Sequence, residues 1–534
     1  MDPSTNGTDG ERGAAWPYGA AALLGLALAL WTFPPDFWLP GAGAPWRPVG
    51  DAAQHIIAQR YFLHDAWRWP PLVAANLNTP MGTNIAFADG IPLIALPLKL
   101  IAPWLPAGFH GIGLWYAIAY AAQPVAAIWC LRGTGETRAV PALAAAAMAA
   151  AMPAFLARYG HAALSGHFFL LIALGLYLRL TRAASIRLWA AAVVTSVAAL
   201  LAHPYLAAMC LALLAAAPLT LLLRGDRRWP WAALGAGAAV AAPIAAMAAF
   251  GYLGAQGDGG YGDFALNLLS PVWPFRSLLF RDLAGSEIDA TGHGGWEGYN
   301  YLGAGLLLGL LILAVLAPRA IPAALRRHAG LALALLGLTA LAISHRVGLG
   351  TALLLDLGTP PALLEQFRAS GRFFWPVGYA LLIGCIALLA RQNQASTLLA
   401  LLALLQFADT LPIRAAAQSW ASQREPWSFD APALRRLFAT HSRLTLIPSW
   451  ACVPVHDRGT AHASVLETLA LASETAIPAN TMYLARWHSR PACRDAETLA
   501  TPVAAGELRL LLPEAPPAPG CTSLGQLRVC AVAP

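Results

Sequence analysis

Long, uninterrupted runs of apolar residues most strongly constrain what this chain can fold into. The runs are about 17–24 residues long, the length at which an α-helix crosses a hydrocarbon core of about 30 Å. Charged residues make up only 11% of the 534 residues, whereas soluble globular proteins carry about 25%. So few charges cannot solvate the surface of a soluble protein of this size. The sequence therefore predicts an integral membrane protein.

We expect eleven of these runs to cross the membrane. The first, 16–33, follows a polar tail, 1–15, and has no small-residue cleavage site behind it, which is typical of a signal anchor. The segment 91–105 is short and interrupted by prolines, so we expect it to be re-entrant or interfacial. The other ten spans are expected at 111–131, 139–157, 164–180, 188–203, 205–223, 229–252, 300–317, 329–345, 373–390 and 395–412.

Arginine positions predict the orientation of these spans. If 91–105 does not cross, every arginine-rich loop falls on the side of the amino terminus, which the positive-inside rule makes the cytoplasmic side. These loops hold Arg132 and Arg138, Arg179 to Arg187, Arg224 to Arg228, Arg319 to Arg327, and Arg391. Orientation thus accounts for the formal net charge of +7, and no basic stripe with interleaved aromatics indicates nucleic-acid binding.

Residues 413–534 differ in character from the rest of the chain. Their apolar runs shorten to strand length, and helices are expected after Asp430, as an N-cap, and near Ser464–Thr475. The strand-like runs are Leu444–Ile447, Leu508–Leu512 and Leu527–Val532. This pattern predicts a small soluble α/β domain on the outer side of the membrane.

Four of the seven cysteines lie in this carboxyl-terminal region. An even number of cysteines in a domain placed outside the membrane fits disulfides, which persist in oxidising compartments. We expect Cys521 to pair with Cys530 across a hairpin-like loop and Cys452 to pair with Cys493; four free thiols are the alternative. Cys130, Cys210 and Cys385 lie in apolar spans and are expected to be packing residues.

The expected outer loops, 34–110, 253–299 and 346–372, hold the most unusual polar residues. The first stretch is Gly50-Asp51-Ala52-Ala53-Gln54-His55. Asp51 and Gln54 have the spacing of a capping box. Asp51 is equally a candidate general base at the bilayer surface, where burial can tune a carboxylate's pKa, and His55 would then contact substrate.

Asp89 stands where the chain re-enters the membrane, in an Asp-Gly pair. Such a pair is a strong turn signal, but an ionisable group at this depth is also a candidate substrate-binding residue. Histidines gather in two later outer turns, at His161 and His167 and at His203, beside Arg158 and Tyr159. They suit either a divalent metal or amphipathic anchoring at the interface.

Two further stretches precede late spans. Gly294–Tyr301 places Glu297, Tyr299 and Asn300 among glycines and aromatics, which fits a sugar-binding or metal-holding corner, or an aromatic belt at the membrane surface. Gln366–Pro376 contains Arg368, Ser370 and Arg372 on the side where arginine is rare. Two arginines at a helix amino terminus fit a phosphate or pyrophosphate; the alternatives are pairing with Glu365 or contact with lipid headgroups.

Four of these stretches together resemble a family of bacterial multi-pass membrane proteins of unknown function. They are Gly50–His55, Phe87–Pro92, Glu297–Gly303 and Phe367–Pro376, and the resemblance runs from about residue 30 to 412. That family in turn resembles the GT-C glycosyltransferases, which take a sugar from a polyprenyl-phosphate donor at the outer membrane surface. Many of these enzymes also end in an outer soluble domain.

The resemblance implies roles for four residues. Asp51 matches the first-loop acid that serves as base or acceptor-binding group, Arg368 or Arg372 matches the phosphate contact, and Glu297 matches an auxiliary acid. The family often holds a divalent metal, Mg²⁺ or Mn²⁺, for which Asp51 and Glu297 are the candidate ligands here. Between 158 and 166, however, the chain has no carboxylate where the family carries one, so metal dependence stays open.

The sequence therefore predicts an all-α, GT-C-like polytopic membrane protein with a small α/β extracytoplasmic domain, located in the bacterial cytoplasmic membrane. The expected activity is transfer of a sugar from a polyprenyl-phosphate carrier to a cell-envelope glycan, lipid or protein. A transporter or flippase of a lipid-linked sugar is the main alternative, although it would need more polar groups near mid-membrane. A non-catalytic scaffold whose outer domain binds a partner is the third.

Overall fold

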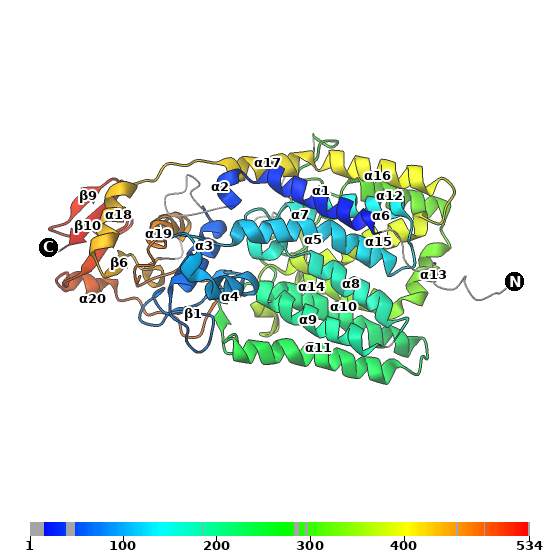
Figure 1. Ribbon diagram of the computed structural model, residues 1–534, viewed down its shortest axis with the longest axis horizontal. Helices are drawn as coiled ribbons and strands as arrows, with labels where there is room; N and C mark the ends of the chain where they lie inside the picture. The colour runs from blue at the N-terminus through cyan, green and yellow to red at the C-terminus, as the bar shows by residue number, and fades with distance from the viewer. Residues whose placement is uncertain are drawn as a thin grey trace.

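The computed structural model describes residues 15–38, 49–183, 185–281, 283, 288–293, 297–454, 458–484 and 486–531. Long helices run side by side in a bundle, and a smaller domain of strands and short helices sits at one end of it (Figure 1). The long helices are α1 (Trp16–Thr32), α5 (Ile112–Arg132), α6 (Ala139–Ala150), α8 (Phe168–Leu180), α9 (Ile186–Ala202), α10 (Pro204–Leu223), α11 (Trp229–Ala249), α12 (Ala304–Leu316), α14 (Ala329–Ile343), α15 (Trp375–Leu389) and α16 (Ala395–Asp409).

The bundle has the composition of a multi-pass membrane protein. Five helical segments of the described chain are long and apolar enough to cross a membrane. Two bent pairs raise the number to seven: α12 with α13 (Ala320–Arg327), at 104°, and α16 with α17 (Leu411–Ser422), at 42°. The expected membrane bundle is therefore confirmed with five to seven spans by length and composition.

Small residues let the helices of the bundle approach closely. Gly25 of α1 lies against the backbone of α5, where an added Cβ would come within 2.1 Å of the carbonyl oxygen of Tyr120. Gly305 of α12 has the same relation to Leu402 of α16, at 2.3 Å. Because lipid tails leave little hydrophobic drive between helices, such close backbone packing is the main attraction available to them.

The segment after the first helix folds into a compact cap at one end of the bundle. Its longest element is α3 (Asp51–His64), which is almost wholly buried. The expected re-entrant segment forms α4 (Pro92–Leu100), and nine residues rise only about 14 Å, less than half a hydrocarbon core. The cap also contains α2 (Pro35–Trp38), β1 (Val73–Ala74), β2 (Thr83–Asn84) and the 3₁₀ turns η1 (Ile85–Ala88) and η2 (Ala102–Trp104).

Arginine-bearing loops gather at the opposite end of the bundle, around α13 (Figure 1). Arg228 donates to the carbonyl oxygen of Arg182 at 2.6 Å, and Arg224 to that of Arg327 at 2.8 Å. These bonds join three loops that are far apart in sequence. The grouping of arginines expected from the positive-inside rule is thus present in the fold.

The carboxyl-terminal domain is built on a four-stranded sheet in the order β6-β8-β10-β9. β6 and β8 are parallel, which requires a crossover connection, and α19 supplies it. The expected strands form β6, β8 and β10, and Asp430 caps the expected helix by accepting from the Ala433 amide. The elements are α18 (Ala431–Thr440), β6 (Arg443–Ile447), α19 (Arg458–Ala472), α20 (Asp495–Ala500), β8 (Glu507–Leu511), β9 (Thr522–Leu524) and β10 (Leu527–Ala531).

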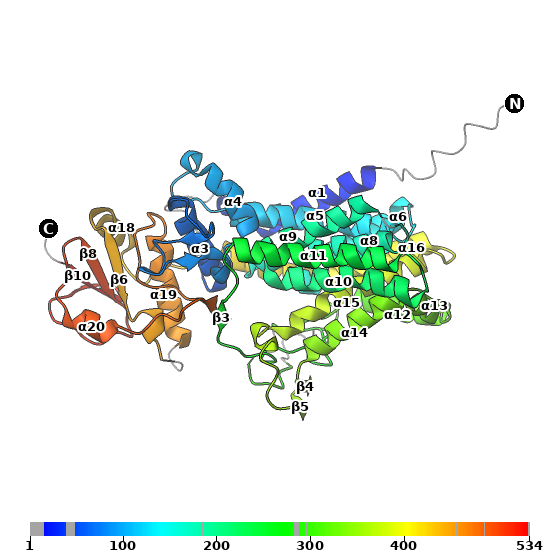
Figure 2. The ribbon, with the colours of Figure 1, turned by 90° about the horizontal axis from the view of Figure 1, so that it is seen from below.

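Buried polar contacts fix this domain against the cap. Arg60 of α3 donates to the carbonyl oxygen of Gly108 at 2.6 Å and to that of Ala470 in α19 at 3.3 Å. The Tyr61 hydroxyl donates to the carbonyl of Ile477 at 2.7 Å. A short antiparallel pair, β3 (Gln256–Gly257) with β7 (Arg486–Trp487), adds a second joint, and Figure 2 shows β3 between the bundle and this domain.

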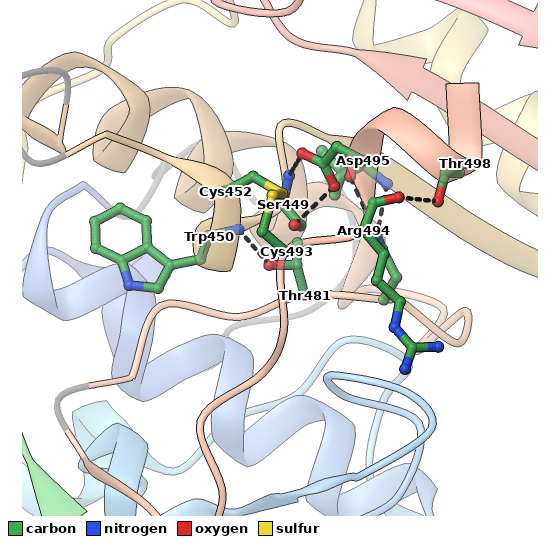
Figure 3. The surroundings of a disulfide bond; sticks show 10 residues. Ser449, Trp450, Cys452, Thr481, Cys493, Arg494, Asp495 and Thr498 are labelled. Atoms are coloured by element: carbon green, nitrogen blue, oxygen red, sulfur yellow. Dashed lines mark hydrogen bonds between the residues drawn. A yellow bond between two sulfur atoms is a disulfide. The ribbon is translucent and has the colours of Figure 1, made fainter. Parts of the chain in front are cut away.

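Both expected disulfides are present. Cys452 bonds to Cys493 and Cys521 bonds to Cys530, while Cys130, Cys210 and Cys385 are buried free thiols. Around the first bond, Ser449 donates to Asp495 and the Trp450 amide donates to Thr481, and the indole of Trp450 projects away from the disulfide (Figure 3). The bond and these contacts hold the turn that carries Trp450.

Removing the longer disulfide should destabilise the domain more than removing the shorter one. The Cys452–Cys493 bond spans 41 residues and the Cys521–Cys530 bond spans 9. Loop-closure entropy predicts losses of about 4 and about 2.5 kcal/mol, respectively. We expect the Cys452→Ala/Cys493→Ala variant to unfold at the lower urea concentration in detergent. An equal or larger loss from the short loop would contradict the entropic account.

Candidate functional site

A polar cavity of about 470 Å³ lies where the cap, the loops 253–299 and 346–372, and the carboxyl-terminal domain meet. Pocket volumes in the range of about 300–1,000 Å³ are typical of ligand sites. Charged and histidine side chains from all three parts line it: Asp51, Asp89, Asp258, His161, His203, Glu297, Glu365, Arg368, Arg372, Arg458, His462 and Arg486. Aromatic side chains complete the wall: Phe87, Tyr205, Phe264, Trp450 and Tyr483.

Asp51 is held in this cavity by a histidine. Gly50 is the N-cap of α3, with a positive φ of 57° and no side-chain capping bond, so the capping-box alternative for Asp51 is wrong. The Asp51 carboxylate instead lies 2.5 Å from Nε2 of His161. Burial raises the pKa of Asp51, but the hydrogen bond and charge of His161 outweigh it and lower the pKa to about 2. Asp51 therefore stays ionised at any physiological pH.

Glu297 is the buried centre of an ion cluster. It is 3% exposed, and its Oε2 accepts from Arg158 Nη1 at 2.9 Å and from Arg372 Nε and Nη2 at 3.1 and 2.9 Å. Its Oε1 lies 3.4 Å from Nε2 of His161. Burial opposes ionisation, but the charges of Arg372, Arg158 and His161 prevail and lower the pKa of Glu297. His161 thus stands between the two carboxylates that the sequence singles out.

Asp89 faces two buried histidines. It occupies a left-handed turn position, with φ of 50°, at the end of η1, so it is a turn residue and a cavity residue at once. One carboxylate oxygen lies 3.5 Å from Nε2 of His203 and the other 3.8 Å from Nε2 of His55. The ring of His203 accepts from the Tyr205 amide through Nδ1. Nε2 of His203 therefore carries the proton and points it at Asp89.

The two arginines of the late loop have different partners. Arg372 directs Nε and Nη2 at Glu297, leaving only Nη1 for a ligand. Arg368 lies over the ring of Phe264, 4.9 Å from its centroid, and has no ion pair with any residue that the structure describes. Arg368 is therefore the cation of this loop that is available to an anionic ligand. Glu365 accepts from the Gly260 and Tyr261 amides and forms no ion pair with either arginine, so the alternative pairing with Glu365 is wrong.

Four predicted site residues lie outside the cavity wall. Ser370 donates to the carbonyl of Ala342, and Asn300 donates to the carbonyls of Gly298 and Gly371. Tyr299 is buried against Phe275. All three hold the loops that carry Glu297 and Arg372. His55 likewise lies behind the wall, completely buried.

The carboxyl-terminal domain contributes residues that sequence reasoning did not find. Trp450, His462 and Tyr483 pack edge to face, with ring centroids 4.5–5.9 Å apart. Arg458 stacks over Trp450, and Arg486 donates to the carbonyl of Gln366 at 2.6 Å. A single tryptophan two residues before an expected disulfide cysteine, Trp450, was the only signal for any of them.

The carboxylates of this site do not fit a divalent metal. Among the described residues, no three His, Cys, Asp or Glu side chains are arranged to hold one. Oε2 of Glu297 already accepts from two guanidinium groups, and Oε1 faces His161. His161, in turn, sits against Asp51. The described residues around Asp51 and Glu297 therefore do not form a divalent-metal site.

Buried His55 predicts a loss of stability in mild acid. Burial and the charge of His161 lower the pKa of His55 to about 3, although the charge of Asp51 opposes this shift. A histidine in the unfolded chain has a pKa of about 6.5. Below pH 6.5 the unfolded chain binds a proton that the folded chain does not, so stability falls with pH. The loss attributable to His55 should reach about 2–3 kcal/mol at pH 4.5.

This prediction is checked by thermal unfolding in detergent between pH 7.5 and 4.5. His55→Gln should flatten the pH dependence of the unfolding temperature. His64→Gln, on the exposed face of the same helix, should leave it as in the wild type. Equal slopes for wild type and His55→Gln would contradict the assignment.

Two family models match the chain and together cover most of it. The model described as a domain of unknown function, DUF6311, matches residues 22–411, and the model of the DUF6311 C-terminal domain matches residues 433–532. No curated protein shows a significant match to the chain.

Proposed function

We propose a glycosyltransferase function for this chain, which belongs to the DUF6311 family. It takes a sugar from a polyprenyl-phosphate carrier and transfers it to a hydroxyl group on the outer face of a bacterial cytoplasmic membrane, as GT-C enzymes do. One observation carries the proposal. Two residues line the same cavity beside an apolar helix bundle: Asp51, an ionised carboxylate held by a histidine, and Arg368, an arginine with no ion pair to any described residue.

The proposal includes a specific topology. Counting each bent pair as one span gives seven crossings. The four shorter apolar helices of the bundle bring the total to eleven; they are α1, α6, α9 and α14. The tail 1–15 then lies in the cytoplasm, 16–412 form the membrane domain, and 413–534 form a periplasmic domain. Disulfides in that domain fit an oxidising compartment. The polar cavity opens on the same side.

The reaction needs a base, a leaving group and a way to stabilise it. The acceptor oxygen attacks the anomeric carbon of the donor, the bond from that carbon to the phosphate oxygen breaks, and the electron pair leaves with the phosphate. Asp51 orients the hydroxyl and takes its proton as the new bond forms, when the attacking oxygen becomes strongly acidic. A carboxylate with a low pKa suits this late proton transfer, because it remains ionised until then.

Positive charge stabilises the departing phosphate. Arg368 lies beside the phosphate, which gains negative charge as the bond breaks. Such preorganised positive charge at a developing anion is usually the largest single contribution to catalysis. Nη1 of Arg372 adds a second donor, while Glu297 holds the rest of that guanidinium in place. The aromatic wall of Trp450, His462 and Tyr483 supplies flat faces to the acceptor side of the cavity.

Arg368→Gln tests the donor half of this proposal. Losing one charged contact to the leaving phosphate should lower the transfer rate about 100-fold, measured as release of polyprenyl phosphate from a panel of polyprenyl-phosphate sugars. Arg346→Gln is the matched control, because Arg346 faces Asp356 on the β4–β5 hairpin (Arg346–Leu349 and Ala352–Asp356), away from the cavity.

Two results would overturn the proposal. Equal loss in both arginine variants would remove Arg368 from the site. Movement of the intact lipid-linked sugar across a liposome, with no transfer to any acceptor, would replace the transferase with the transporter.

A further inference from the structure

A second cavity lies at the arginine end of the bundle, far from the polar site. Its volume is about 430 Å³, and α8, α12, α13, α14 and α15 surround it. The walls are aliphatic, as the side chains of Leu174, Leu313, Leu335 and Leu381 illustrate. Such a cavity is within the size range of about 300–1,000 Å³ that ligand sites have, and neither Asp51 nor any other part of the polar site touches it.

Cations ring one rim of this apolar cavity. Arg182, Arg224, Arg327 and Arg391 line it together with His328. Arg224 reaches across the rim and donates to the carbonyl of Arg327. Among the residues that the structure describes, none of these four arginines has an ion pair with an acidic side chain. Asp226 and Glu136, the nearby acids, are already paired with Arg228 and Arg138.

The charges of this rim act on one another. Burial and the positive charges of Arg224, Arg327 and Arg182 together lower the pKa of His328 to about 4. The ring of His328 is fixed by the hydroxyl of Tyr177, 2.9 Å from its Nδ1. Among the described residues, no unpaired acidic side chain balances the positive charge of this rim, which borders an apolar interior.

We propose that this cavity binds one anionic phospholipid from the leaflet at the arginine end of the bundle. The phosphate lies on the rim arginines and an acyl chain enters the aliphatic cavity. Basic pockets between membrane helices bind anionic headgroups in this way. The rim arginines complement an anionic headgroup, and the aliphatic walls complement an acyl chain. A free phosphate would leave those walls uncovered. The proposal does not depend on the glycosyltransferase function.

A glycine in the wall offers a sharp test. Gly384 lines the cavity, and a Cβ added there would meet no atom within 4 Å, so the side chain of Gly384→Leu has room to enter the cavity and fill part of it. Gly337 of α14 also has open space around an added Cβ but does not line the cavity. Gly337→Leu is therefore the matched control for bulk.

The rim is tested in parallel. Arg182→Gln/Arg327→Gln removes two rim charges, while Arg319→Gln removes an exposed arginine of the same end that does not line the cavity. Native mass spectrometry of the full-length, detergent-purified protein measures binding of phosphatidylglycerol, with phosphatidylcholine of the same chains as the neutral lipid and glycerol phosphate as the headgroup without chains. Unfolding temperatures of all variants confirm that they are folded.

The proposal predicts preferential binding of phosphatidylglycerol. The double arginine variant should weaken it roughly 10- to 30-fold, Gly384→Leu should weaken it at least as much, and both controls should bind like the wild type. Equal binding of the two lipids would overturn the role of the arginines. Full competition by glycerol phosphate, or unchanged binding to Gly384→Leu, would overturn the entry of an acyl chain.

Discussion

Asp51→Asn should abolish sugar transfer while leaving the protein folded. The substitution keeps the size and shape of the side chain but removes the group that accepts the proton of the attacking hydroxyl. Loss of a general base costs typically 10²- to 10⁴-fold in rate. We expect the rate of transfer from a polyprenyl-phosphate sugar to fall within this range, with donor binding retained, because Arg368 is unchanged.

The control for Asp51→Asn is Asp356→Asn. Asp356 is an exposed carboxylate on the β4–β5 hairpin, paired with Arg346, and its loss should not affect transfer. A transfer rate for Asp51→Asn within a factor of about three of the wild type would exclude Asp51 as the base. A variant that fails to bind donor would instead show that Asp51 shapes the cavity.

Glu297→Gln should be the most destabilising single substitution in the polar cavity. Glu297 is buried, and its carboxylate is the common partner of Arg158 and Arg372. Breaking a buried pair by removing one partner leaves an uncompensated charge, which costs about 3–5 kcal/mol. The expected result is a lower unfolding temperature in detergent. Glu497→Gln, on an exposed turn of α20, should leave the unfolding temperature unchanged.

A second variant separates lost charge balance from lost shape. Glu297→Gln/Arg158→Met removes one buried charge of each sign, and such paired removal is often neutral or stabilising relative to the single change. We therefore expect the double variant to regain part of the unfolding temperature. If it is less stable than Glu297→Gln, hydrogen bonding of Arg158 matters more to the stability of the site than the ion cluster does.

Periodicity and composition predicted the parts of the fold that depend on local sequence. The apolar runs became the long helices of the bundle, with ends within about four residues of those expected, except that the run 139–157 is broken and α6 ends at Ala150. The strands at 444–447 and 508–511 and the cap at Asp430 follow from short-range patterns and are present. The two disulfides followed from cysteine number and compartment.

Topology placed the main site residues together, but it did not give their partners. Asp51 lies 246 residues before Glu297, and Arg368 lies 71 residues after it. All three were nevertheless assigned to outer loops, and loops on one face can converge. Which charge meets which depends on side-chain geometry that spacing does not encode. His161 was considered as a metal ligand, whereas the structure places it against Asp51. Arg372 was expected to hold phosphate and mainly holds Glu297.

The contribution of the carboxyl-terminal domain could not have been predicted from its sequence. Trp450, Tyr483 and Arg486 reach the cavity because α19 docks on α3 and β7 pairs with β3. Both contacts join segments more than 200 residues apart and leave no periodic signal. The four-residue 3₁₀ turn that carries Ala162 next to His161 is equally invisible in composition.

Cysteine accessibility tests the central claim, one compound site on the outer face, most directly. Single cysteines at Gln366 and His462 report on the late loop and on the carboxyl-terminal domain at the polar cavity, and one at the exposed Thr137 reports on the arginine end. In intact spheroplasts, a membrane-impermeant maleimide should label the first two and label Thr137→Cys only after lysis. Labelling of Thr137→Cys before lysis, or protection of either cavity position until lysis, would contradict the account.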